Sequence, residues 1–292
     1  MAVNKGETNV ITTADNDRVL SIDFIEQFNG SLSKILEVIG ATNLRPVPAG
    51  STIKIYKTTL TEPEDTREEG GVIPLTKVET KLAKTETIDI RYARKATTGE
   101  EIQKVGFDRA VSDTDAKLLR SEQSKIRNDL MASLAEGTGA ASGENFQKAL
   151  ANAWAQTVNA FDDEDEVSVV AFANPVDVAE YLGNANVTVQ EVFGMQYLTG
   201  FVGVTGVFLS SRVPQGTLYT TAVDNIKMYY VDVNGDLGTA LGYTADESGY
   251  VGVKHYAGNE RATYETGTVV GVKFITENLS GVVVSTIGDD SE

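Results

Sequence analysis

Residues 90–139 read IRYARKATTGEEIQKVGFDRAVSDTDAKLLRSEQSKIRNDLMASLAEGTG, and the second half of this stretch has the most regular hydrophobic pattern in the chain. Ser112, followed by Asp115, resembles a capping box at a helix start, and Gly137 stands where a helix would end. The pattern predicts a helix over Ser112–Glu136, roughly 40 Å long at about 1.5 Å per residue. Its apolar stripe recurs every three or four residues and consists of Leu118, Leu119, Ile126, Leu130, Met131 and Leu134.

Before this helix the hydrophobic period changes to two. Ser51–Leu60 and Thr85–Ala93 alternate in this way, which predicts two strands of a long hairpin. The connection between them is rich in charge and contains Pro63 and Pro74, so it is too long for a tight turn. A two-stranded ribbon buries little apolar surface and is marginally stable alone in water. We therefore expect the ribbon to lie on something else, either its own body or a neighbouring molecule.

The remaining chain mixes both kinds of element, which predicts an α+β fold. The first twenty residues have no periodicity and predict a flexible arm. The other predicted elements are a helix over Ile22–Ile39, a helix over Glu144–Phe161, a strand over Val167–Ala173, a short helix after Pro175, and the final strands Thr268–Thr276 and Gly281–Ile287.

Composition and charge exclude several classes of function. The 292 residues include no cysteine, so disulfides, thiolate metal sites and cysteine nucleophiles are excluded. The formal net charge is −17, and residues 141–292 hold twenty acidic but only six basic residues. Such a surface repels phosphates, so we expect no tight nucleic-acid binding by a basic face. The polar first residues and the absence of a long apolar stretch predict a cytosolic protein with no membrane partner.

The sequence contains no convincing catalytic or metal-binding pattern. His255 is the only histidine and is predicted to be structural. Asp232–Asp236 (DVNGD) begins like a calcium loop, but Leu237 stands where that loop requires glycine, which favours an Asn-Gly hairpin turn. Consecutive carboxylates such as those of Asp162–Glu166 are expected to point in different directions, which favours solvated side chains over a metal site. We therefore expect no catalytic, cofactor-binding or metal-binding residues, and no enzyme activity.

Two stretches resemble a known family. One is Phe24–Lys57, FIEQFNGSLSKILEVIGATNLRPVPAGSTIKIYK, and the other is the stretch 90–139 quoted above. Both are similar to major capsid proteins of tailed bacteriophages with the HK97 fold, in particular those of phages and prophages of Gram-positive bacteria. The resemblance extends over nearly the whole chain in the order of elements, whereas the acidic second half matches only in pattern.

The resemblance implies an HK97-like α+β fold with four parts. Residues 1–45 would form an N-terminal arm, and residues 46–105 an extended loop with flanking strands that lies across a neighbouring subunit. Residues 106–145 together with 262–292 would form the peripheral domain around the long spine helix. Residues 146–261 would form the axial domain, whose tips meet at the centres of capsomers.

The resemblance also implies a function and partners. Hexamers and pentamers of the chain would build an icosahedral shell around packaged double-stranded DNA, in the virion, after assembly in the host bacterial cytoplasm. Because only about twenty polar residues precede the first predicted helix, a separate scaffolding protein is expected, together with a portal. The lysines of the ribbon are candidates for covalent cross-links by location only. Contacts between subunits are expected at the charged end of the ribbon, at Arg67, Glu68, Glu69, Lys77 and Lys81.

Two alternatives stay open at this point. An encapsulin-type nanocompartment shell has the same fold but encloses cargo enzymes instead of DNA. A glycan- or metal-binding enzyme domain on the second half of the chain belongs to a different class. A monodisperse monomer stabilised by a ligand would favour that enzyme domain, and the lack of a catalytic constellation counts against it.

Overall fold

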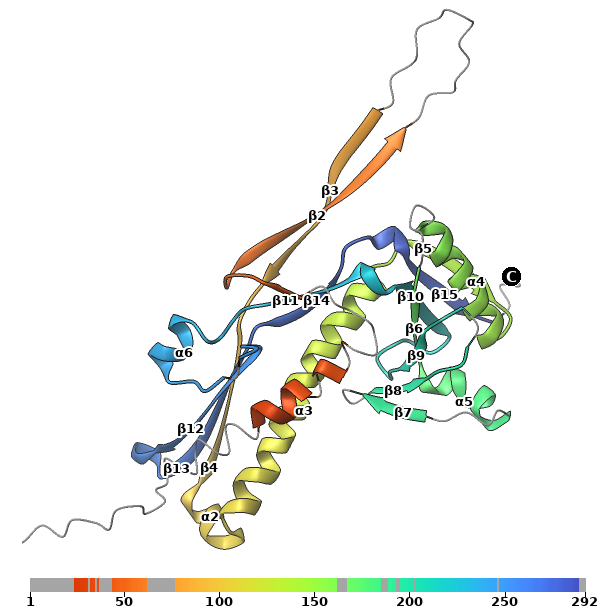
Figure 1. Ribbon diagram of the computed structural model, residues 1–292. Coiled ribbons are helices and arrows are strands. Elements are labelled where there is room, and N and C mark those ends of the chain that lie inside the picture. The colour runs from red at the N-terminus through yellow and green to blue at the C-terminus, as the bar shows by residue number, and fades with distance from the viewer. Residues whose placement is uncertain are drawn as a thin grey trace, which may run out of the picture.

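The computed structural model describes residues 24–30, 32–34, 36, 44–61, 77–161, 167–184, 189–192, 195–201, 203–245 and 247–288. A long helix runs through the middle of the molecule, a large sheet with two helices lies on one side of it, and a two-stranded ribbon projects away from the body (Figure 1). Residues 24–30 and 32–34 are helical, within the helix predicted over Ile22–Ile39, whereas the predicted arm lies outside the described residues. The longer helices are α2 (Gly99–Val105), α3 (Phe107–Ala135), α4 (Phe146–Ala160), α5 (Pro175–Asn184) and α6 (Asp236–Leu241).

The described strands form four sheets, which have the orders β5-β15-β10-β6-β9-β8-β7, β1-β11-β14, β12-β13-β4 and β2-β3. The mixture of helices and strands confirms the predicted α+β class. The strands are β1 (Leu44–Pro46), β2 (Ser51–Thr61), β3 (Lys77–Ile88), β4 (Arg91–Thr98), β5 (Gly139–Gly143), β6 (Val169–Ala173), β7 (Val189–Val192), β8 (Met195–Leu198), β9 (Gly206–Leu209), β10 (Thr217–Ala222), β11 (Ile226–Tyr230), β12 (Val251–Gly258), β13 (Thr263–Val270), β14 (Val272–Thr276) and β15 (Val282–Ile287).

The seven-stranded sheet is buried on both faces. Successive side chains of a strand point to opposite sides, so one strand can contribute to two cores. In β6, Val170 and Phe172 face the core that contains α3, whereas Val169, Ala171 and Ala173 face the core that contains α4. Every residue of β6 is buried, which explains why its sequence is a continuous apolar run.

Helix α3 begins at Phe107, earlier than the predicted start at Ser112. Ser112 therefore lies inside the helix, and the predicted capping box is wrong. The start is set instead by Gly106, whose φ of 87° ends α2 and turns the chain into α3. The predicted end is confirmed to within one residue, at Ala135. The predicted stripe is confirmed by its buried members, Leu119, Ile126, Leu130, Met131 and Leu134.

The C-terminal half of α3 packs on β14. The hydroxyl of Ser133 lies 2.9 Å from the Thr276 hydroxyl and accepts a hydrogen bond of 3.0 Å from the Thr276 backbone N–H. Both residues are buried, so these bonds satisfy polar groups that would otherwise be costly in the core. The contact fixes the position of the helix along the strand.

The predicted hairpin is confirmed, but its second strand is not where the pattern placed it. The prediction was Thr85–Ala93, whereas β3 spans Lys77–Ile88, and the chain then turns into β4, which pairs with β13. The connection between β2 and β3, residues 62–76, lies outside the described residues. The pattern missed most of β3 because most of its residues are exposed and only Ile88 is buried, so burial imposes no alternation of apolar and polar residues.

The sheets distribute the C-terminal strands over two regions. β13 pairs with β12 on one side and with β4 on the other, beside α3. β15 pairs with β10 and β5 and so completes the seven-stranded sheet, although the resemblance grouped it with the peripheral strands. The four-part domain division stays a prediction.

Candidate functional site

The ribbon of β2 and β3 has little support from the other described elements along its outer half. It projects away from the body, and in Figure 1 no other labelled element covers its outer half. Three of its large apolar side chains are more than half exposed: Tyr56 at 55%, Val78 at 60% and Leu82 at 52%. A group of exposed apolar residues on a projecting element is typical of a surface that contacts another molecule.

The two faces of the ribbon differ in chemistry. Directly paired residues of antiparallel strands lie on the same face, and Tyr56 pairs with Leu82. Val78 lies four residues from Leu82 on the same strand, so it shares this face. Lys77, Glu79 and Lys81 therefore lie on the opposite face. We call the face with Tyr56, Val78 and Leu82 the apolar face, and the other one the charged face.

The charged face is satisfied within the subunit. Glu79 forms ion pairs with Lys77 and Lys81, and the Lys81–Glu79 distance is 3.1 Å. Hydrogen bonds from Lys77 and then Lys81 lower the pKa of the Glu79 carboxyl below its ordinary value. All three side chains are in contact with solvent, so salt screens these pairs. No comparable partner is present for the apolar face among the residues that the structure describes.

The base of the ribbon, in contrast, is firmly attached to the body. Ile55 and Ile88 are buried in a small core with residues of β11 and β14. Lys84 forms ion pairs with Glu86 at 2.6 Å and with Glu136, the residue that follows the last residue of α3. Burial would raise the pKa of the Glu86 carboxyl, but hydrogen bonds from Lys273 and Lys84 outweigh it and lower this pKa. The ribbon is therefore anchored to the body at its base, while its outer half projects from the subunit.

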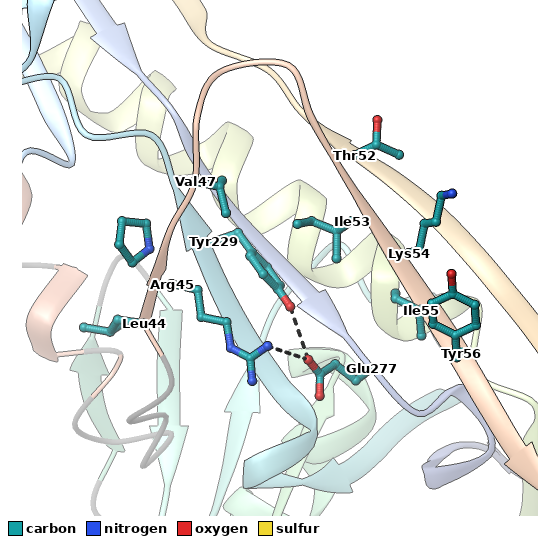
Figure 2. A pocket seen from close by; sticks show the side chains of 11 residues that line it. Leu44, Arg45, Val47, Thr52, Ile53, Lys54, Ile55, Tyr56, Tyr229 and Glu277 are labelled. Carbon is teal, nitrogen blue, oxygen red and sulfur yellow. Dashed lines mark hydrogen bonds and ion pairs between the residues drawn. The ribbon is translucent and has the colours of Figure 1, made fainter. Parts of the chain in front are cut away.

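A groove of about 730 Å³ lies beside this base, between β1, the start of β2 and the face of β11 (Figure 2). Glu277 stands in it and accepts a hydrogen bond of 3.2 Å from the Tyr229 hydroxyl, and it lies 3.8 Å from Arg45. Two smaller hollows, of about 450 and 380 Å³, share Glu277 with this groove. The base of the ribbon is thus bordered by a series of adjoining concavities.

The predicted contact residues lie partly inside and partly outside the described residues. Arg67, Glu68 and Glu69 lie outside the described residues. Lys77 and Lys81 lie on the charged face, where they share Glu79. Sequence reasoning missed the apolar face, although a signal was present. Val78 and Leu82 are isolated apolar residues in a charged strand, at a spacing that places them on one side.

His255 is buried in a polar cluster that joins α3 to the sheet of β12, β13 and β4, as expected for a structural histidine. Its Nε2 lies 2.8 Å from the Asp115 carboxylate. The same carboxylate accepts hydrogen bonds from Lys95 at 2.5 Å and from Thr266 at 2.8 Å. Burial would raise the pKa of Asp115, but the hydrogen bonds from His255, Lys95 and Thr266 and the charge of Lys95 outweigh it and hold this pKa below its ordinary value.

The other sequence features provide no site. Within the described residues, no three or more His, Cys, Asp or Glu side chains gather as a metal ion requires. Residues 233–235 form a turn, but the chain continues into α6 and not into a paired strand, so the predicted Asn-Gly hairpin is wrong. The acidic run Asp162–Glu166 lies outside the described residues. None of the described helices combines the length and apolarity needed to cross a membrane.

Comparison with known proteins gives matches in structure but not in sequence. No protein-family model matches the chain, and no curated protein matches it significantly. A virus-like particle from Pyrococcus furiosus is similar over 93% of this chain and 99% of that chain, with 12% identity and a TM-score of 0.54. The mature capsid of bacteriophage PhiM1 is similar over 85% and 86%, with 10% identity and a TM-score of 0.53.

A third solved structure is the holo-SrpI encapsulin complex from Synechococcus elongatus PCC 7942. It is similar over 88% of each chain, with 12% identity and a TM-score of 0.50. At these identities the likeness is one of fold, and it extends over most of both chains in all three cases. The chain therefore has the HK97-like α+β fold, which confirms the fold predicted from its sequence.

Proposed function

We propose that the chain is a major capsid protein, which assembles as hexamers and pentamers into an icosahedral shell that encloses phage double-stranded DNA. The observation that carries this proposal is the ribbon, whose base is anchored in the body and whose apolar face is left largely exposed by the described residues of its own subunit. A closed shell supplies a neighbour for every such face. The HK97-like fold supports the proposal because the similar solved structures include a phage capsid.

The proposal assigns a role to each part of the chain. Residues 46–105 form the extended loop, which lies over a neighbouring subunit, and residues 1–45 form the arm. Residues 106–145 with 262–292 form the peripheral domain, and residues 146–261 form the axial domain at the capsomer centre. The helix α3 is the spine of the subunit.

The apolar face would provide most of the contact energy. Full burial of a large apolar side chain contributes about 1.5–3 kcal/mol, so Tyr56, Val78 and Leu82 together outweigh the exposed ion pairs, which contribute about 0.2–1 kcal/mol each. The charged residues then lie at the rim of the contact and set its orientation. Contact candidates at this rim are Arg67, Glu68, Glu69, Lys77 and Lys81.

The charge distribution fits a container for DNA. Twenty acidic residues against six basic ones in residues 141–292 give a surface that does not hold phosphates tightly, so packaged DNA can slide. We infer that the shell assembles in the host bacterial cytoplasm with a separate scaffolding protein and a portal, and that it becomes part of the virion. It needs no cofactor and carries out no enzyme reaction.

Light scattering after size exclusion, followed by electron microscopy, tests the proposal with and without a candidate scaffolding protein. The parent chain should form closed shells. A double variant, Val78→Glu with Leu82→Glu, should stay an unassembled subunit with an unchanged circular dichroism spectrum. A parent chain that stays monomeric with its scaffolding partner, at every salt and protein concentration, would overturn the proposal.

An encapsulin-type shell is the second candidate, because the chain is also similar in fold to the Synechococcus elongatus complex. The contents of shells purified from a native source separate the two. DNA that resists nuclease supports the capsid, whereas a single co-purified cargo protein without DNA supports the encapsulin.

A further inference from the structure

Helix α3 carries most of its acids on one side. Four of its five acidic residues recur every seven positions, a spacing that places them in one line along the helix: Asp108, Asp115, Glu122 and Asp129. The last three of these form ion pairs within the subunit, with Lys95, Lys125 and Arg91 respectively. The acidic side of α3 is therefore largely neutralised by its own chain.

A second line of polar residues runs along the opposite side of α3. Its members are three or four positions apart, so they are neighbours on the helix surface, and they are Arg109, Asp113, Lys117, Arg120, Ser124 and Asn128. All of them except Ser124 are exposed. The line is roughly 28 Å long at about 1.5 Å per residue. It contains three bases and only one acid.

Arg212, between β9 and β10, adds a fourth base to this line. Its guanidinium donates hydrogen bonds to the Ser124 hydroxyl, at 2.5 Å, and to the side-chain oxygen of Asn128. Both acceptors are neutral. Burial, and then the charge of Arg212, lower the pKa of the Arg127 guanidinium below its ordinary value, so a further cation is close by. We call the six helix residues together with Arg212 the basic ridge.

The basic ridge is not explained by the needs of the subunit. None of its four bases forms an ion pair with an acid that the structure describes, Asp113 included. Arg109 also lies in the first turn of α3, where the helix dipole disfavours a cation. Solubility does not require these bases, because they reduce the magnitude of a net charge that is already −17. An acidic partner would complement the ridge.

We propose that the basic ridge binds an acidic surface in residues 141–292 of a second copy of the chain when subunits assemble. This inference rests on the proposed shell assembly. Residues 141–292 contain twenty acidic residues against six basic ones, so each copy supplies the complementary charge. The Asp113 carboxylate within the ridge repels phosphates, so a protein surface fits the ridge better than a DNA backbone does. The contact also offsets the repulsion between copies of the same net charge.

A matched pair of charge reversals, Lys117→Glu and Lys104→Glu, tests the proposal. Both lysines are exposed and helical, but Lys104 lies on α2, outside the ridge. Both changes alter the net charge equally, and subunit unfolding should hardly change in either case. At physiological ionic strength, Lys117→Glu should need a protein concentration for assembly roughly three- to tenfold higher than Lys104→Glu. Lys117→Arg should assemble like the parent chain.

Salt and the binding partners separate the possible outcomes of this comparison. In about 1 M salt the Debye length is about 3 Å, so the difference between the two Glu variants should largely disappear. Equal assembly of the two variants at physiological ionic strength overturns the inference. A difference that is present only with a scaffolding protein assigns the ridge to that protein, and normal shells that retain less DNA assign it to phosphates. Either result also overturns the inference.

Zero-length cross-linking identifies the acidic surface. A carbodiimide joins the Lys117 amine to a carboxylate only when the two are in contact, and shells built from equal amounts of unlabelled and ¹⁵N-labelled chains show whether a linked pair comes from two copies. We expect a link from Lys117 to an acid of residues 141–292 in another copy. Replacing that acid with lysine should restore the assembly of Lys117→Glu. Links only within one chain, such as to Asp113, overturn the inference while parent shells uphold the proposed function. Absence of parent shells overturns both.

Discussion

Helix α3 buries one side from end to end, whereas in strand β3 only Ile88, at its base, is buried. Both elements carry many charged residues, and both are long. The helix is stabilised by the body of its own subunit, through a stripe that reaches from Leu119 to Leu134. The ribbon instead leaves Tyr56, Val78 and Leu82 largely exposed on one face.

This difference separates two contributions to the stability of an assembled particle. Burial along α3 is complete before any neighbour arrives, so it determines whether the subunit folds. Burial of the apolar face requires a second copy, so it determines whether subunits associate. Substitutions in the two regions should therefore change different measured quantities, the free energy of unfolding in one case and the concentration needed for assembly in the other.

The largest effect is expected for Gln123→Pro, in the middle of α3. Proline removes a backbone hydrogen bond and clashes with the preceding turn, which costs about 3 kcal/mol or more in a regular helix. Gln123 is itself buried, so the kink cannot be relieved into solvent. Denaturant unfolding of the subunit measures the loss, with Gln123→Ala as the control that keeps the helix. An unfolding midpoint like that of the control would show that α3 does not support the subunit.

A leucine-to-alanine pair compares the two regions directly. Leu134 is 0% exposed in α3, so Leu134→Ala should lower the free energy of unfolding by about 2–5 kcal/mol. Leu82 is 52% exposed, so Leu82→Ala should change it by less than about 0.5 kcal/mol. Both are measured by urea unfolding of unassembled subunits. Equal losses would mean that the ribbon folds against its own body and needs no neighbour.

The same contrast explains how much of the fold the sequence could predict. The apolar stripe of α3 could be predicted because burial of one side of a helix requires apolar residues at every third or fourth position. The start of the helix could not be predicted, because it is set by the backbone conformation of Gly106. Ser112 resembles an N-cap in sequence but lies inside the helix. β3 was mostly missed because an element that its own subunit leaves exposed carries no burial pattern.

The candidate site shows the same limit. The charged end of the ribbon, with Lys77 and Lys81, was visible from composition alone. Which face these lysines occupy depends on the register of β2 and β3, where Tyr56 pairs with Leu82, and a register is set by contacts distant in sequence.

An intermediate effect is expected at Asp115, which ties α3 to the neighbouring sheet. The pKa of Asp115 is lower in the folded subunit than in the unfolded chain. Its carboxylate therefore contributes stability above the unfolded pKa of about 3.9, and this contribution is lost as the pH falls through the lower, folded value. Asp115→Asn should cost about 1.5–3 kcal/mol at pH 7 and should flatten the loss of stability below about pH 4. Thermal unfolding of both proteins between pH 2 and 7 measures this, and parallel curves would exclude Asp115 as a source of acid sensitivity.

The smallest effect on the subunit is expected for two neighbouring ribbon residues that face opposite ways, Lys81 and Leu82. Lys81→Gln and Leu82→Gln introduce the same side chain, and both sites are exposed, so subunit unfolding should hardly change.

The two variants should differ in the protein concentration that they need for assembly. Leu82→Gln removes apolar area from each contact, about 1–2 kcal/mol, so the protein concentration needed for shells should rise roughly tenfold. Lys81→Gln removes only an exposed ion pair, which salt already screens, so this concentration should stay near that of the parent at physiological ionic strength. Light scattering over a concentration series measures both. If Lys81→Gln impairs assembly more than Leu82→Gln, the charged face is the one that meets the neighbour, and the orientation proposed for the ribbon must be reversed.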